Sequence, residues 1–171
     1  LLSMADECGM DWTKARIVDP ACGGGAFLAP VAQRMLKAAL GSDPARDRRA
    51  LAVHVCKRLR GIEIETFCAW LARVFLQLTL VEHLGYMSPE LSDVVSSQDS
   101  MLVDDQLAGE FDLVIGNPPY GRVTLSPGLR EKYARSLYGH ANLYGIFTDM
   151  ALRMVKEGGI IAYVAPTSFL G

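Results

Sequence analysis

Alternation of short apolar segments with helical patterns constrains the fold of this chain more than any other feature of its sequence. The apolar segments lie near residues 16–18, 60–64, 94–97, 111–116 and 160–165. Longer stretches with apolar residues at helical spacing separate them, such as 26–40 and 67–84. Strands that alternate with helices form a parallel sheet covered on both faces. The sequence therefore predicts a doubly wound α/β fold.

A glycine-rich loop follows the first predicted strand. The sequence there is Asp19-Pro20-Ala21-Cys22-Gly23-Gly24-Gly25-Ala26-Phe27-Leu28, with a helix predicted to start at its end. Glycines let the backbone approach a ligand, and a helix start offers free amides. The spacing differs from the dinucleotide fingerprint, and Asp19 would repel a pyrophosphate. A carboxylate at this position suits a cationic ammonium group; the alternative is a loop whose glycines serve tight packing alone.

Two further predicted strands end in acidic residues. Glu63 closes the second strand, where an acidic residue of a doubly wound sheet is placed to hold a ribose diol. Glu65 and Thr66 follow it and are expected to act as a dipole partner and a cap for the next helix, which is also the alternative explanation of the cluster. Asp99 follows the third strand and is placed to accept a hydrogen bond from the amine of a base, although a lone Asp in a loop is usually solvated.

The fourth predicted strand runs into Asn117-Pro118-Pro119-Tyr120. The two prolines exclude helix for the residues before them and remove two backbone donors, so the segment is extended and stiff. Asn117 adds a neutral acceptor, and Tyr120 adds a flat ring with a polar tip. These groups suit the binding of a planar amine, and the alternative is a proline-rich turn that ends a strand.

The order of these motifs resembles one family, the S-adenosylmethionine-dependent adenine-N6 DNA methyltransferases of the gamma arrangement found in bacterial restriction-modification systems. The resemblance covers Ile17 to about Leu170, and the glycine loop and the Asn-Pro-Pro-Tyr motif are its anchors. Residues 142–147 and 157–166 are also similar to later segments of the family. The family more often has serine where Gly24 lies.

This resemblance implies a site for S-adenosylmethionine. Asp19 and the backbone from Gly23 to Gly25 would hold the methionine end, Glu63 the ribose hydroxyls and Asp99 the amino group of the cofactor's adenine, with Ile64 against one face of that ring. The residues expected to bind the cofactor are Asp19, Pro20, Ala21, Cys22, Gly23, Gly25, Phe27, Glu63, Ile64, Asp99, Ser100 and Asn117.

The resemblance also implies methyl transfer to an adenine that has left the DNA duplex, because its N6 is out of reach while it is stacked and paired. Asn117 and the carbonyl of Pro118 would accept both N6 hydrogens. The ring of Tyr120 would stack on the base, and Phe147 would close the other side of the pocket. The residues expected to be catalytic are Asn117, Pro118, Pro119 and Tyr120.

Length and charge bear on the partners. The resemblance implies that the 171 residues form an incomplete catalytic domain truncated after about the fifth strand, with the DNA-recognising region after Gly171 and an amino-terminal segment before Leu1. A net charge of −2 is not that of a domain that holds phosphates by itself. Double-stranded DNA is the expected partner, mostly through the missing regions, and a restriction or specificity subunit is a second candidate.

The stretch 121–141 is long for a connection after a strand and follows the Asn-Pro-Pro-Tyr motif directly. Loops of this length are usually functional or mobile. We expect it to be poorly ordered without substrate and to fold over the cofactor or the DNA strand. Tyr133 and Tyr138 are candidates for stacking on bases, and packing of a short helix in the loop is the alternative for both.

The four cysteines show no Cys-x-x-Cys pair and no metal-ligand spacing with histidine, which indicates reduced thiols in an intracellular protein and no metal. The resemblance implies the cytoplasm of a bacterium or archaeon. No run of residues is expected to span a bilayer. Two other functions compete with the one above. The first is methylation of a protein glutamine or an RNA base, because the same motif holds any planar amide or amine. The second is a non-catalytic cofactor-binding or specificity subunit.

Overall fold

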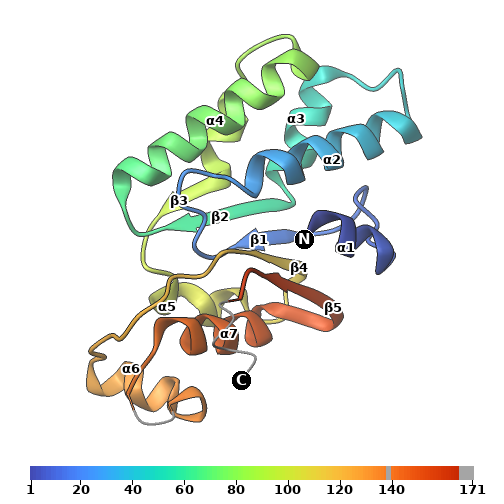
Figure 1. The fold of residues 1–171 in the computed structure, drawn as a ribbon. Helices are drawn as coiled ribbons and strands as arrows, with labels where there is room; N and C mark the ends of the chain where they lie inside the picture. Colours follow the sequence, from blue (N-terminus) through green and yellow to red (C-terminus); the bar gives the residue numbers. More distant parts are fainter. Residues whose placement is uncertain (138–139, 166–171) are drawn as a thin grey trace.

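The computed structural model describes residues 1–137 and 140–165. These residues form a five-stranded sheet in the order β3-β2-β1-β4-β5, with every neighbouring pair parallel (Figure 1). The strands are β1 (Ile17–Asp19), β2 (Leu59–Glu63), β3 (Val95–Ser97), β4 (Phe111–Gly116) and β5 (Val155–Tyr163). The prediction of a doubly wound parallel sheet is confirmed.

Helices cover both faces of this sheet (Figure 1). One face carries α1 (Leu2–Glu7), α2 (Leu28–Ser42), α3 (Arg48–Cys56) and α4 (Thr66–Leu84). The other carries α5 (Ser100–Val103), α6 (Pro127–Lys132) and α7 (Leu143–Met154). Short 3₁₀ turns, η1 (Pro89–Val94), η2 (Asp104–Leu107) and η3 (Ala134–Ser136), complete the connections.

Each face has its own hydrophobic core because side chains alternate along a strand. In β1, Ile17 packs on the α2–α4 face and Val18 on the α7 face, and both are fully buried. Leu113 and Val114 of β4 divide in the same way. Strands buried on both faces need apolar residues at successive positions, which is the pattern that the sequence shows.

Two boundaries differ from the sequence prediction. The strand expected at 160–165 begins earlier, at Val155 directly after α7, and the segment Glu157-Gly158-Gly159 is an irregularity inside this β5 strand and not a turn before it. Val155 pairs with Phe111 and Ile160 with Leu113, so the intervening residues bulge, and Gly158 adopts a φ of +75°. A tight turn and a bulge use the same glycines, and only the pairing with β4 separates them.

The cap of α4 also differs, because Glu65 occupies the N-cap position and its side chain makes no capping hydrogen bond, while Thr66 is already helical.

The described residues contain one helix that is long and apolar enough to cross a membrane, the 19-residue α4. By length and composition alone, the expectation that no segment meets these two criteria was therefore wrong. The inner face of α4 packs in the first core. The outer face leaves four large apolar side chains exposed, namely Phe67, Trp70, Phe75 and Leu78.

Candidate active site

A cavity of about 310 Å³ lies at the carboxyl ends of the strands. It lies where β1 and β4 are neighbours and the order of the strands reverses, which is where doubly wound sheets bind ligands. The segments after β1, β2, β3 and β4 and the start of α7 all contribute to its wall. Its lining residues are Pro20, Ala21, Glu63, Ile64, Asp99, Ser100, Met101, Asn117, Pro119, Leu143 and Phe147.

Asp19 ends β1 as a buried carboxyl group with an exposed fraction of 1%. Its Oδ1 accepts a hydrogen bond from the Ala21 amide at 3.0 Å, whereas its buried Oδ2 has no partner among the described residues. Burial raises the pKa of Asp19 to about 7, and the charge of nearby Glu63 adds to this rise. Burying a carboxylate oxygen without a partner costs free energy, and a bound cation would offset that cost by pairing with the negative charge.

Gly116, the last residue of β4, makes room for this carboxyl group. A Cβ at Gly116 would lie 2.6 Å from Asp19 Oδ1, which is inside van der Waals contact. The absence of a side chain at one strand end therefore permits the buried acid at the end of its neighbour.

Glu63 holds the glycine loop in place. Its Oε2 accepts from the Gly23 amide at 2.8 Å, and its Oε1 accepts from the Glu65 amide at 2.9 Å. Gly23 and Gly25 have φ values of +52° and +87°, which disfavour other residues. Each carboxylate oxygen retains a second lone pair, so Glu63 can accept further hydrogen bonds from a ligand in the cavity.

Five residues of the predicted cofactor set lie outside the cavity wall, namely Asp19, Cys22, Gly23, Gly25 and Phe27. The side chain of Cys22 points into the first core beside Gly61, and burial raises the pKa of its thiol. Phe27 is the N-cap residue of α2 and packs against the same core. The contribution of Cys22 to the cavity is indirect: its amide donates a hydrogen bond to the Ile62 carbonyl at 3.0 Å and so attaches the loop to β2.

The segment after β3 joins the loop after β1. Asp99 Oδ1 accepts from the Met101 amide at 2.9 Å as the N-cap of α5, and the Ser100 hydroxyl donates to the Pro20 carbonyl. Met101 and Leu143 line the cavity, although the sequence prediction did not include them. Both lie within two residues of positions that were singled out, Asp99 and the segment at Asn142, and this proximity was the only available signal.

Within the Asn117–Tyr120 motif, the first and last residues are joined by a side-chain hydrogen bond. The Tyr120 hydroxyl lies 2.6 Å from Asn117 Oδ1 and 3.1 Å from the Val164 carbonyl oxygen. The Tyr120 ring stacks on Tyr144 with centroids 5.9 Å apart and remains 47% exposed. Asn117 is thus at the cavity with its acceptor oxygen already in use. Pro119 lines the cavity and Pro118 is buried beside it.

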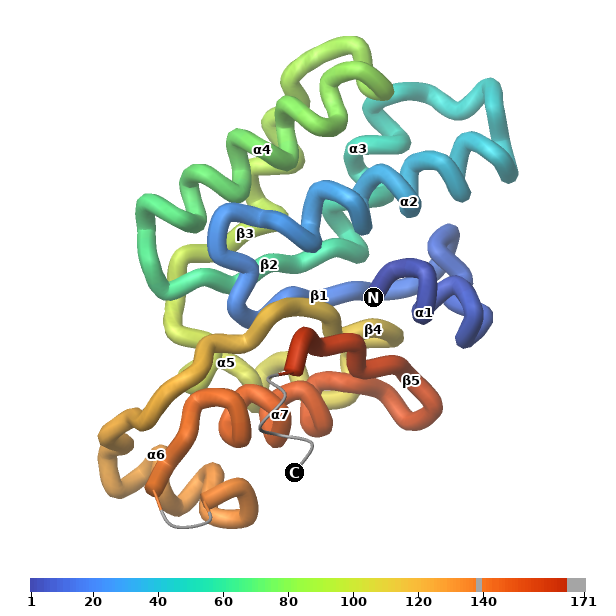
Figure 2. The backbone as a smooth tube through the Cα atoms, in the orientation of Figure 1, coloured from blue at the N-terminus to red at the C-terminus, as the bar shows by residue number. Residues whose placement is uncertain are grey.

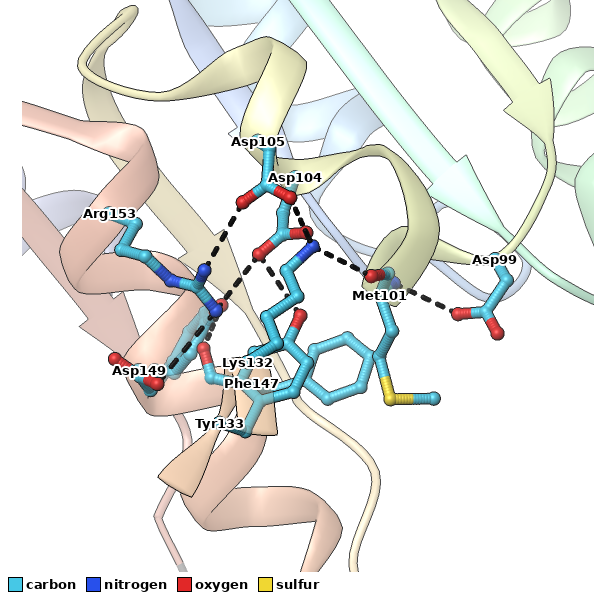
Figure 3. A network of polar contacts seen from close by, with 10 residues as sticks. Asp99, Met101, Asp104, Asp105, Lys132, Tyr133, Phe147, Asp149 and Arg153 are labelled. Carbon is cyan, nitrogen blue, oxygen red and sulfur yellow. Dashed lines mark hydrogen bonds and ion pairs between the residues drawn. The ribbon is translucent and has the colours of Figure 1, made fainter. Parts of the chain in front are cut away.

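A buried ionic cluster lies behind one cavity wall (Figure 3). The fully buried carboxylate of Asp104 forms an ion pair with Lys132, accepts from the Tyr133 hydroxyl at 3.0 Å and lies 3.1 Å from Arg153 Nη2. Lys132 also donates to the Met101 carbonyl at 3.0 Å. Burial acts to lower the pKa of Lys132, but the hydrogen bonds to Asp104 and Asp105 outweigh it and raise that pKa.

This cluster corrects one prediction about the stretch 121–141. Tyr133 is fully buried, and Arg153 lies 4.6 Å from its ring centroid, so Tyr133 does not present a face for a base to stack on. The alternative that it packs a short loop helix, α6, is confirmed. Tyr138 lies outside the described residues. The predicted change in order on substrate binding stays a prediction.

Loss of the Asp104 charge is expected to destabilise the protein strongly. In Asp104→Asn, Lys132 and Arg153 would keep their charges in a partly buried setting without the carboxylate between them, so the free energy of unfolding should fall by about 3–5 kcal/mol. Urea unfolding measures this change. Asp105→Asn is the matched control, because Asp105 pairs with the same two cations but its side chain is 67% exposed, and its loss should be about 1 kcal/mol or less. Equal losses for the two variants would contradict the assignment.

Comparison with known proteins first gives the class. A putative class I S-adenosylmethionine-dependent methyltransferase from Listeria monocytogenes shares the fold over 99% of this chain and 46% of its own, with a TM-score of 0.56 and 17% identity. The Type ISP restriction-modification enzyme LlaGI aligns with 99% of this chain and 17% of its own, with a TM-score of 0.71 and 15% identity. The fold is therefore that of Rossmann-like class I methyltransferases.

The family follows from sequence. Residues 57–171 match the model described as Eco57I restriction-modification methylase, and residues 8–102 match the DNA-methyltransferase domain of MmeI. The chain belongs to the Eco57I restriction-modification methylase family. The Type II methyltransferases M.PaeR7I of Pseudomonas aeruginosa and M.BstVI of Geobacillus stearothermophilus are 31% and 30% identical to it over 87% and 90% of its length. The chain spans 26% and 29% of these two relatives.

Proposed function

We propose that this protein transfers the methyl group of S-adenosylmethionine to the N6 amino group of an adenine flipped out of double-stranded DNA. The observation that carries the proposal is a single cavity whose lining includes Glu63, Asp99 and Asn117. A donor molecule and an acceptor amine can therefore meet in it. Family membership supports the methyltransferase activity, and the cavity's side chains support the choice of cofactor and acceptor.

The residues around the cavity fit the cofactor. The unpartnered Oδ2 of Asp19 suits the positive end of the molecule, and Glu63 has lone pairs for a ribose diol. Ile64 offers an apolar side chain with an exposed fraction of 60% to the cofactor's adenine ring. Asp99 uses one oxygen to cap α5, which leaves the other for an amino group. When bound, the cofactor supplies an electrophilic methyl group on a sulfonium.

The acceptor side relies on this chain's own oxygens. Asn117 Oδ1 and the Pro118 carbonyl would accept the two N6 hydrogens and draw the nitrogen away from planar conjugation. The N6 lone pair would then be free to accept the methyl group that the cofactor supplies, and one N6 proton would pass to solvent afterwards. Tyr120 would exchange its hydrogen bond to Asn117 for a position over the base, and Phe147 forms the wall opposite.

Two proteins of similar structure support DNA as the substrate. LlaGI is described in complex with a DNA substrate mimic, and DrdV is described in a DNA complex. We propose that residues 1–171 form the cofactor-binding and catalytic part of a longer cytoplasmic protein. In that protein, a separate target-recognition region supplies most of the DNA affinity and a restriction or specificity subunit is a partner.

Transfer of a labelled methyl group tests the proposal. Unmethylated plasmid DNA is incubated with the protein and methyl-labelled S-adenosylmethionine, digested to nucleosides and separated. Label in N6-methyl-2′-deoxyadenosine supports the proposal, whereas label in N4-methyl-2′-deoxycytidine, in RNA or in a protein glutamine would overturn it. Glu63→Ala should weaken cofactor binding measured by calorimetry. Glu65→Ala is the matched control, because the Glu65 side chain makes no capping bond and does not line the cavity.

A further inference from the structure

A second hollow, of about 320 Å³, is formed by the segment that follows the Asn117–Tyr120 motif and is strongly basic. Its wall is formed by Arg122, Val123, Thr124, Arg130, His140 and Ala141. No acidic side chain belongs to this set. Both arginines and the histidine are exposed.

The two arginines are not paired with an acidic side chain of the described residues. Neither Arg122 nor Arg130 forms a side-chain hydrogen bond or ion pair with any residue that the structure describes. Lys132, two positions after Arg130, contrasts with them because its charge is matched by Asp104 and Asp105 (Figure 3). The stretch 121–141 holds four Lys and Arg residues and one acidic residue, whereas the rest of the chain holds 13 basic and 18 acidic residues. Unmatched positive charge is therefore concentrated in an otherwise acidic protein.

The hollow has a fixed position relative to the Asn117–Tyr120 motif. Arg122 follows Tyr120 by two residues, a distance of about 7 Å at most along the chain. The backbone there is held by an antiparallel bridge between Arg122 and Asn142, with the Val123 amide donating to the Ala141 carbonyl at 3.0 Å and the Leu143 amide to the Gly121 carbonyl at 2.9 Å. Leu143 also lines the main cavity.

The chain path explains how the two sites come together. From the end of β4 it leaves the sheet, forms α6 and returns to the start of α7 (Figure 2). Arg122 lies on the outgoing arm, His140 on the returning arm and Arg130 on α6, so residues up to 19 positions apart share one wall. A ligand held there would contact Arg122, which forms the bridge to Asn142.

We propose that this hollow binds the backbone phosphates of the target DNA strand next to the flipped adenine. A nucleotide whose base enters the main cavity brings its own two phosphodiesters with it, and Arg122 is close enough to Tyr120 to meet one of them. Arginine carries its charge at any physiological pH and matches phosphate oxygens with a fork of N–H donors. His140 adds a donor on the opposite arm. This inference rests on the proposed function, because it assumes that the base in the cavity belongs to a nucleic acid.

Salt dependence of DNA binding tests the proposal. The probe is a fluorescein-labelled duplex with a central A·A mismatch, and fluorescence anisotropy gives the Kd at several KCl concentrations. The double variant Arg122→Gln/Arg130→Gln keeps the long side chains but removes both charges. Its affinity should fall roughly tenfold for each arginine at about 0.1 M salt, and the slope of log K against log salt should decrease by roughly two. Arg60→Gln is the matched control, because Arg60 is exposed on β2 away from this hollow.

A second experiment identifies which phosphates the arginines contact. In a duplex with uncharged methylphosphonates on either side of the mismatched adenine, wild type and the double variant should bind with the same affinity, because the charges that the arginines meet have been removed. Binding of S-adenosylmethionine by calorimetry should be the same in both proteins.

Each outcome decides the proposal. Three results with the variants would each overturn it: an unchanged slope of log K against log salt in the double variant, an equally large loss of affinity in Arg60→Gln, or a difference between wild type and the double variant that persists on methylphosphonate DNA. Two results with wild type would also overturn it: no DNA binding, or tighter binding of single-stranded RNA of the same sequence. Failure of methyl transfer to DNA while the arginine effect on the phosphates remains would overturn the proposed function and leave the phosphate site standing. Normal methyl transfer with an unchanged slope would do the reverse.

Discussion

Replacing Asn117 with alanine is expected to lower the rate of methyl transfer by at least about 100-fold, the scale of losing one positioned group that stabilises developing charge. The structure places Asn117 at the cavity wall, where its side-chain oxygen is the neutral acceptor for an N6 hydrogen. Without it, the amine keeps its planar conjugation and its lone pair remains a poor nucleophile. Single-turnover transfer of labelled methyl to DNA, at saturating cofactor, measures the chemical step.

The control separates catalysis from folding. Asn142→Ala removes an asparagine that caps α7 through the Tyr144 amide, at 3.0 Å, and lies outside the cavity lining. It should cost about 1 kcal/mol of stability and leave the single-turnover rate within a few-fold of wild type. A rate for Asn117→Ala within tenfold of wild type, in a folded protein, would contradict the assigned role.

Replacing Asp19 with asparagine is expected to remove a pH dependence of cofactor binding. Burial raises the pKa of Asp19 to about 7, so the free protein carries a proton there below that pH. A cationic ligand favours the carboxylate, and binding below pH 7 must release the proton. The affinity of the wild type for S-adenosylmethionine should therefore fall about tenfold for each pH unit below about pH 7 and should be constant above it. Asp19→Asn should bind weakly at every pH, with no such slope, in calorimetric titrations.

The same group predicts the stability of the free protein. The folded state holds the Asp19 proton up to about pH 7, whereas the unfolded chain loses it near pH 4, so stability falls as pH rises between these values. The total fall across this pH range is about 4 kcal/mol as an upper limit. Asp19→Asn should therefore gain stability relative to wild type as pH rises from about 4 to about 8, measured by urea unfolding. Asp93→Asn, at an exposed site, is the control, and its stability should change with pH as that of wild type does. The same pH dependence in Asp19→Asn as in wild type would count against the buried-acid assignment.

Sequence reasoning succeeded where the information is local. The end of β1 at Asp19, the glycines that follow and the prolines after β4 each restrict the backbone within a few residues. Parallel strands bring their carboxyl ends to one edge of a sheet, so Glu63, Asp99 and Asn117 were expected to lie together once the strands were located. The structure places all three in the wall of one cavity.

Features that depend on distant partners were not predictable in the same way. The burial of Tyr133 depends on its hydrogen bond to Asp104, which lies 29 positions earlier and belongs to no recognisable motif. The bulge in β5 depends on its register with β4. Nor does the sequence show that Arg122 and His140 share a hollow, because the antiparallel bridge between the two arms of the loop brings them together.

The neighbouring positions of β1 and β4 have an evolutionary consequence. The side chains proposed for the ribose and base of the donor follow β2 and β3, whereas those proposed for the acceptor follow β4 and belong to α7 and the intervening loop. Descendants of such a protein can therefore acquire a new acceptor by rewriting one contiguous stretch of the gene, downstream of β4, while the machinery for the donor is inherited unchanged.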